Sequence, residues 1–105
     1  MKTVKLRLEY KCFPIWIYDE QGSLLDNDMP EEIKQNRNLE EALEILQEEF
    51  DSLYIDNGIE FGYKGFQDYQ TKQQFTKIIQ SIEEQVNKEL NDNYNIINLI
   101  DLNNM

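Results

Sequence analysis

The sequence of 105 residues contains no histidine and only one cysteine, Cys12. The absence of histidine removes the commonest general base, proton shuttle and metal ligand of proteins. A single cysteine allows no intrachain disulfide bond and offers no second thiolate to a zinc ion, so Cys12 is interpreted as a small hydrophobic residue. We therefore expect no catalytic activity, no cofactor and no metal site, and a reducing location such as the cytoplasm.

The sequence also lacks a long hydrophobic run. No stretch approaches the ~20 apolar residues that a membrane-spanning helix needs. Charged and apolar residues alternate over residues 1–9, which predicts no signal peptide. Hydrophobic residues nevertheless make up 40% of the chain and aromatic residues 11%, which is enough for a compact core. We expect a single domain over residues 1–105 with no attachment to a membrane.

Basic residues are few, because 10 lysines and arginines stand against 21 aspartates and glutamates, for a net charge of −11. The excess is local: residues 19–60 contain fourteen acidic residues and only two basic ones, Lys34 and Arg37. Such a negative field disfavours anionic membranes and direct contact with the phosphates of nucleic acids. It attracts basic surfaces, so the expected partner is a basic protein.

Short segments with apolar residues at alternate positions, bounded by turn residues, predict β-strands. Four segments are interpreted in this way, residues 3–10, 13–18, 23–26 and 59–63. The sequence Asp-Glu-Gln-Gly at 19–22 predicts a hairpin turn before the third of them. Residues 94–102 are rich in apolar residues and are interpreted as a last strand, with a short helix as the alternative.

Two amphipathic helices are predicted between these strands. The first begins at a capping signature at Asn38 and extends to Tyr54, with the Asp-Asn-Gly sequence at 56–58 as its stop. The second extends from a capping signature at Thr71 to Leu90. The order β-β-β-α-β-α-β indicates a two-layer α+β domain, in which both helices cover one face of a mostly antiparallel sheet.

Three local patterns resemble known sites but lack a necessary part. Glu-Tyr-Lys at 9–11 has the spacing of metal-dependent nucleases, but no acidic residue precedes it to share the metal. Asp-Asn-Asp at 26–28 begins like a calcium-binding loop, but the glycine and glutamate required at later positions are absent. Residues 62–66 join two aromatic residues to a single base, which is too little positive charge for nucleic acid.

The remaining candidate is an acidic helix face. Five acidic residues of the first predicted helix point away from its apolar stripe: Glu40, Glu41, Glu44, Glu48 and Asp51. Several are three or four residues apart, where like charges repel one another and weaken a helix. A purely structural surface usually mixes charges of both signs, so this face predicts a binding site for a basic partner. The alternative is a solvated face that serves solubility.

In size, α+β pattern and acidic helix the chain resembles the small acidic immunity proteins that are encoded beside bacterial toxins. The residues that carry the likeness are Glu40, Glu41, Glu44, Glu48 and Asp51. The resemblance implies one-to-one inhibition of a cognate toxin domain, often a nuclease, without catalysis. The chain is also similar to phage proteins that mimic nucleic acid, which implies inhibition of a restriction or CRISPR-type nuclease as the alternative function.

Affinity for such a partner needs anchors, and aromatic residues supply most of the binding energy of protein interfaces. The candidate anchors are Trp16, Tyr18, Tyr54 and Tyr63. The alternative for Trp16 is that it packs beneath a helix, since large aromatic residues are mostly buried. Because the charge of −11 opposes self-association through an exposed strand edge, we expect a monomer or a weak dimer.

Overall fold

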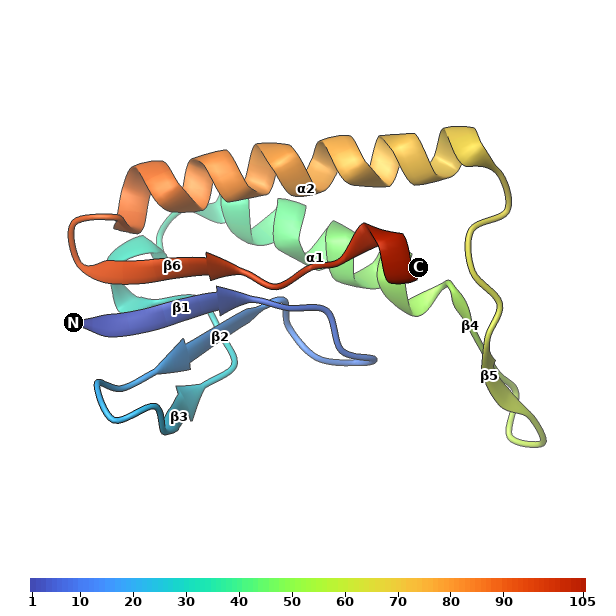
Figure 1. The fold of residues 1–105 in the computed structure, drawn as a ribbon, viewed down its shortest axis with the longest axis horizontal. Helices are drawn as coiled ribbons and strands as arrows, with labels where there is room; N and C mark the ends of the chain where they lie inside the picture. Colours follow the sequence, from blue (N-terminus) through green and yellow to red (C-terminus); the bar gives the residue numbers. More distant parts are fainter.

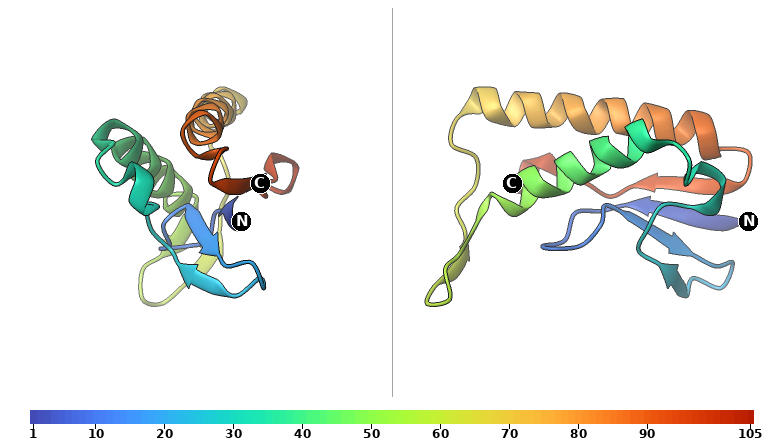
Figure 2. Two further views of the ribbon diagram at one scale, coloured as in Figure 1. Left: turned by 90° about the vertical axis from the view of Figure 1, so that its left-hand side faces the viewer. Right: turned by 180° about the vertical axis from the view of Figure 1, so that it is seen from behind.

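Two α-helices lie on one face of a four-stranded β-sheet, and a separate two-stranded hairpin extends from one end of the molecule (Figure 1, Figure 2). This computed structural model describes residues 1–105, except for the side chain of Asn104. The elements in order are β1 (Lys2–Leu6), β2 (Ile15–Tyr18), β3 (Leu24–Asp26), a 3-10 helix (Glu31–Ile33), α1 (Arg37–Asp51), β4 (Tyr54–Asp56), β5 (Phe61–Tyr63), α2 (Tyr69–Leu90), β6 (Tyr94–Asn98) and a second 3-10 helix (Leu102–Asn104). The α+β class predicted from the sequence is confirmed.

The first strand lies inside the sheet, whose strand order is β3-β2-β1-β6. β1 pairs antiparallel with β2 and parallel with β6, and β3 pairs antiparallel with β2. Parallel strands need a long connection between them. The chain between β1 and β6 ends with α2, which leads directly into β6. The prediction of a strand in residues 94–102 is confirmed for Tyr94–Asn98, and the helical alternative applies to the 3-10 turn that follows.

Both helices begin earlier than predicted. The N-cap of α1 is Asn36 rather than Asn38, and its side chain accepts a hydrogen bond from the amide of Leu39 at 3.1 Å. The N-cap of α2 is Asp68 rather than Thr71, and the Thr71 amide donates to its carboxylate at 2.7 Å, which holds the pKa of Asp68 below its ordinary value. Each helix begins with two exposed residues, Arg37 and Asn38 in α1 and Tyr69 and Gln70 in α2, so the buried stripe starts too late to mark the true cap.

The first helix also ends earlier than predicted, at Asp51 rather than Tyr54. The next residues form β4, which pairs antiparallel with β5 in a sheet of their own. Residues 57–60 form the hairpin turn between them, and Gly58 within it has a positive φ of 83°, which glycine adopts without strain. The Asn-Gly signal therefore belongs to a hairpin, and its interpretation as a helix stop was wrong.

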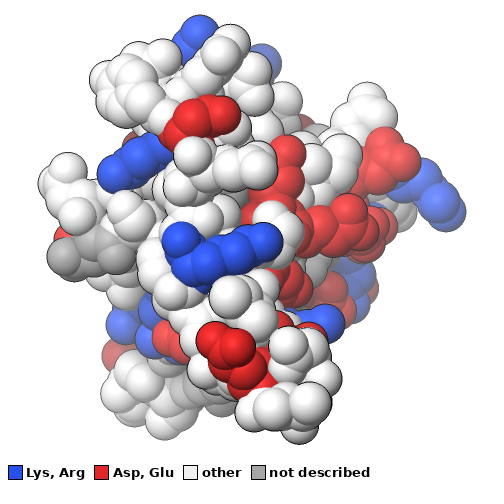
Figure 3. Space-filling model, turned by 90° about the vertical axis from the view of Figure 1, so that its right-hand side faces the viewer, with Lys and Arg blue, Asp and Glu red and all other residues white. Residues whose placement is uncertain are grey.

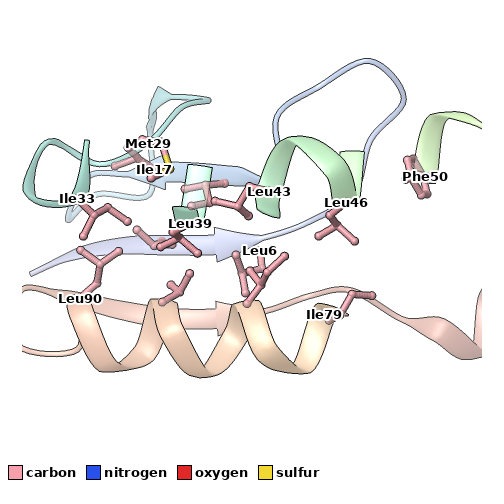
Figure 4. Close-up of a cluster of buried hydrophobic side chains, with 14 of the residues drawn as sticks. Leu6, Ile17, Met29, Ile33, Leu39, Leu43, Leu46, Phe50, Ile79 and Leu90 are labelled. Atoms are coloured by element: carbon pink, nitrogen blue, oxygen red, sulfur yellow. The ribbon is translucent and has the colours of Figure 1, made fainter. Parts of the chain in front are cut away.

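The core lies between the sheet and the two helices (Figure 4). Figure 4 shows Leu6 of β1, Leu43 of α1 and Leu90 of α2 directed into the same interior. The buried hydrophobic residues are Val4, Leu6, Ile15, Ile17, Met29, Ile33, Leu39, Leu43, Leu46, Phe50, Leu53, Phe75, Ile79, Ile82, Val86, Leu90 and Tyr94. In the described part of the chain, no helix combines the length and the hydrophobicity that crossing a membrane requires.

Truncation of Leu43 tests this core. Leu43 is fully buried, so Leu43→Ala is expected to lower the free energy of unfolding by about 3 kcal/mol through lost burial and a cavity. The matched control is Ile45→Ala on the exposed side of the same helix, with an expected change within about 0.5 kcal/mol. Urea denaturation of both variants makes the comparison, and equal losses would contradict the assigned orientation of α1.

Tyr94 gives the fold a dependence on alkaline pH. Burial, followed by the hydrogen bond from its hydroxyl to Glu32 at 2.9 Å, raises the pKa of Tyr94 to about 12. The folded state therefore favours the protonated phenol, and this stabilisation is complete below pH 10 and is lost as the pH rises towards 12. As the pH rises from 10 to 12, the free energy of unfolding should fall less in Tyr94→Phe than in the wild type, because the variant has no phenol to ionise. Urea denaturation at several alkaline pH values measures the difference.

Candidate partner-binding surface

Helix α1 holds its five predicted acidic residues on the side turned away from the core. Glu41, Glu44 and Glu48 are exposed, while Glu40 and Asp51 are half-buried; these five residues are called the acidic face below. Among the residues whose side chains are described, the salt bridges join Arg7 to Glu9 and Lys34 to Glu31, and none reaches the acidic face. In the view of Figure 3, acidic side chains are gathered mainly to the right of the centre, and basic side chains lie at the centre and around the margin.

An apolar residue stands within this acidic surface. The side chain of Ile45 is 50% exposed, although it belongs to a helix whose other large apolar residues are buried. It is four residues from Glu41 and from Glu49 and three from Glu48, so it lies next to these acids on the helix surface. An apolar centre with a charged border is the usual composition of a protein interface. The sequence analysis missed Ile45, whose signal is its position outside the apolar stripe.

The loop between β1 and β2 packs against the C-terminal half of α1. The side-chain amide of Gln47 donates to the carbonyl of Glu9 at 2.9 Å and to the carboxylate of Asp51 at 2.8 Å. The same carboxylate accepts a hydrogen bond from the backbone amide of Lys11 at 2.9 Å, and Lys11 has a positive φ of 62°. Asp51 therefore fixes the conformation of the loop in addition to its place on the acidic face.

This packing leaves an open cavity of about 280 Å³ between the loop and the helix. The lining comes from the loop and from α1 and consists of Lys11, Cys12, Phe13, Glu44, Gln47, Glu48 and Asp51. The acidic face therefore borders a shallow hollow on the side of the loop. Among the described residues, no group of histidine, cysteine, aspartate or glutamate side chains is arranged to hold a metal ion.

Five aromatic rings meet where the loop, α1 and the hairpin converge. This aromatic cluster consists of Tyr10, Phe50, Tyr54, Phe61 and Tyr63. The rings of Tyr54 and Phe61 are stacked with centroids 5.6 Å apart, and the Tyr10 ring meets the Phe61 ring edge-on at 5.2 Å. The Tyr10 hydroxyl donates to Asp56 at 3.2 Å, and burial together with this carboxylate raises the pKa of Tyr10.

Two of the predicted anchors belong to this cluster. Tyr54 and Tyr63 are opposite each other in the β4–β5 register, with ring centroids 5.2 Å apart, and Tyr63 is 44% exposed. Phe61 is more exposed than either, and the sequence analysis missed it because residues 59–63 were expected inside the main sheet. The cluster adjoins the acidic face through Asp51, which holds the loop that carries Tyr10.

The other two predicted anchors lie elsewhere. Trp16 and Tyr18 project from the face of the sheet that the helices leave open, opposite the buried Ile15 and Ile17. The guanidinium of Arg7 lies over the Trp16 ring at 4.4 Å, and the ammonium of Lys5 lies over the Tyr18 ring at 4.4 Å. The alternative that Trp16 packs beneath a helix is therefore wrong. The structure brings Tyr54 and Tyr63 near the acidic face and separates Trp16 and Tyr18 from it.

The comparison with protein families agrees with the resemblance seen in the sequence. Residues 2–99 match the model of a family described as Serratia CdiI immunity protein-like. A search of the curated proteins gives no match for the chain. The family match covers nearly the whole sequence, so the chain belongs to the Serratia CdiI immunity protein-like family. The prediction of a bacterial immunity protein is confirmed.

The role of Asp51 in ordering the loop is testable without a partner. Asp51→Ala removes the acceptor for the Lys11 amide, so this amide should exchange its hydrogen faster, with a stability loss of about 1–2 kcal/mol. Asp51→Asn keeps one side-chain oxygen that can accept from the Lys11 amide. This amide should therefore exchange its hydrogen more slowly in Asp51→Asn than in Asp51→Ala. Hydrogen exchange followed by NMR measures both. Unchanged protection of Lys11 in Asp51→Ala would show that the loop is ordered by other contacts.

Proposed function

We propose that this immunity protein neutralises its cognate toxin by placing the acidic face of α1 on a basic surface of the toxin domain. The general role, neutralisation of a toxin, follows from membership of an immunity-protein family. The finer assignment is supported by one observation above others: five acidic side chains lie together on α1, and none forms a salt bridge with another described residue. The acidic face therefore offers its negative charge to another molecule.

The helix itself supports a function for this charge. Acidic residues three and four positions apart repel one another, so the isolated face costs α1 some stability. A basic partner removes this repulsion without first breaking an internal salt bridge of the face. The same charge accelerates the encounter, because complementary fields steer two proteins together at rates well above those of neutral pairs. Contacts made by Ile45 then add apolar burial to the electrostatic attraction.

The proposed partner is a toxin domain that acts on nucleic acid. A domain of that kind needs a basic surface to hold phosphates, and an acidic protein that covers this surface blocks the substrate. The inhibition is stoichiometric, takes place in the cytoplasm and involves no catalysis by the immunity protein. Family membership favours this function over a phage protein that mimics nucleic acid.

Charge reversal on the acidic face tests the proposal. The double variant Glu44→Lys/Glu48→Lys should bind the toxin domain encoded by the adjacent gene with an association rate constant at least about tenfold lower in dilute buffer. The difference should shrink as salt is added, because salt screens exposed charges. Stopped-flow association kinetics measure the rate constant, and growth of cells that express the toxin domain measures protection.

The matched control changes the net charge by the same amount elsewhere. Glu84 on the solvent side of α2 and Asp92 in the turn after it are both exposed, and neither belongs to the acidic face. The variant Glu84→Lys/Asp92→Lys should associate with the toxin domain nearly as fast as the wild type. Equal slowing of both double variants would assign the effect to total charge and would contradict a specific role for α1.

A further inference from the structure

The hairpin of β4 and β5 extends beyond both helices and the main sheet (Figure 1), and its tip carries exposed apolar side chains. Ile59, in the turn between the two strands, is 98% exposed, and Phe61 at the start of β5 is 60% exposed. Single exposed hydrophobic residues are common on protein surfaces. Two large ones on one projecting hairpin, beside the exposed Tyr63, form an apolar patch at the most prominent point of the molecule.

The tip is held in one conformation before any partner binds. The side-chain oxygen of Asn57 accepts hydrogen bonds from the amides of Ile59 at 3.1 Å and Glu60 at 2.8 Å. The amide of Asn57 also donates to the carbonyl of Glu60 at 3.2 Å. These bonds close the turn around Gly58. A turn that is already ordered loses little conformational entropy on binding, which favours affinity.

The base of the hairpin is fixed to the body of the protein. The amides of Lys64 and Gly65 donate to the carbonyl of Leu53 at 2.7 and 3.2 Å, which ties the end of the hairpin to its beginning. The Tyr10 ring packs against the rings of Tyr54 and Phe61, and its hydroxyl donates to Asp56. The hairpin is therefore an anchored projection, and its direction relative to α1 is set by the aromatic cluster.

The charge of the hairpin indicates the chemistry of what it contacts. Residues 54–63 include Asp56 and Glu60 and no basic residue, so acidic side chains stand on both sides of the apolar tip. The acidic face of α1 lies close to the hairpin, since Asp51 binds the loop that carries Tyr10 and the Tyr10 hydroxyl donates to Asp56. A side chain that is 98% exposed on a projection loses its contact with water when it enters a hollow, and a flat surface covers it far less.

We propose that the β4–β5 hairpin inserts Ile59 and Phe61 into a concave, positively charged cleft of the toxin domain. This inference rests on the proposed function and deepens it, because it specifies the shape of the partner's surface and the element that fills it. The acidic face of α1 lies on the rim of the cleft and steers the encounter. The hairpin occupies the interior of the cleft and slows dissociation, so that two neighbouring parts of one surface govern the two rate constants.

Truncation of the tip tests the insertion. Ile59→Ala and Phe61→Ala should each raise the dissociation rate constant of the complex with the purified toxin domain by at least about tenfold. Their association rate constants in dilute buffer should remain close to that of the wild type, because no charge has changed. The matched control is Leu24→Ala, which removes a side chain that is 51% exposed on the distant strand β3 and should leave both rate constants unchanged.

Hydrogen exchange of the complex supplies a second measurement that requires no variant. Insertion should protect the amides of residues 58–61 when the toxin domain binds. The exposed turn at 20–23 should exchange at the same rate in the free and bound protein. Circular dichroism of each variant establishes that the fold is retained, so that a kinetic change reports on the interface.

The outcomes separate this inference from the proposed function. If the wild type binds and protects, while both tip variants dissociate like the wild type and residues 58–61 stay unprotected, the hairpin does not insert and the acidic face still accounts for binding. If the wild type does not bind the toxin domain at all, both proposals are overturned. If sedimentation shows a wild-type dimer that Ile59→Ala abolishes, the tip contacts a second copy of this chain, and insertion into a toxin cleft is overturned.

Discussion

Burial of the apolar stripe of α1 is the constraint that permits the opposite face of this helix to be acidic. Four of its residues, Leu39, Leu43, Leu46 and Phe50, are buried between the sheet and α2. Full burial of one such side chain contributes about 1.5–3 kcal/mol, whereas a like-charge pair on a helix surface costs about 0.2–0.5 kcal/mol. The core therefore outweighs the repulsion several times over. A helix of this sequence would be unstable alone, and tertiary packing makes it a rigid support for surplus charge.

The aromatic cluster connects three parts of the chain that are far apart in sequence. Tyr10 comes from the loop after β1, Phe50 from the end of α1, and Tyr54 and Phe61 from the hairpin. Edge-on and stacked ring contacts of this kind contribute about 0.5–1.5 kcal/mol each beyond simple burial. Together they fix the angle between the hairpin and the acidic face. The surface proposed to face the toxin domain is thus a single preformed shape, built from one helix, one loop and one hairpin.

The sequence predicted the parts of this fold that depend on local periodicity. Alternation located β1 and β2, and helical spacing located most of α1 and α2, because one-sided burial leaves a period in the chain. The strand β6 was expected only from the apolar composition of residues 94–102. Periodicity did not predict that α1 ends at Asp51 and that residues 54–56 form the strand β4. The Asn57-Gly58 sequence suits the end of a helix and a hairpin turn equally well, so it does not distinguish the two. The pairing of Tyr54 with Tyr63 decides between them, and this contact becomes visible only in three dimensions. The same limit applies to Trp16, whose ring is covered by Arg7, the residue that directly follows the neighbouring strand β1.

The parallel pairing of β1 with β6 has a consequence for the folding of the chain during its synthesis. β1 is an interior strand, yet one of its two neighbours is the last strand to be translated, so the sheet stays open on that side until Tyr94–Asn98 have left the ribosome. Contacts between residues so distant along a chain form slowly, because a long loop must close before they contribute. α1 likewise lacks part of its cover until α2, which packs against it, has been synthesised. The parallel pairing of β1 with β6 is therefore expected to be a late step of folding, which completes the sheet only after the rest of the chain is in place.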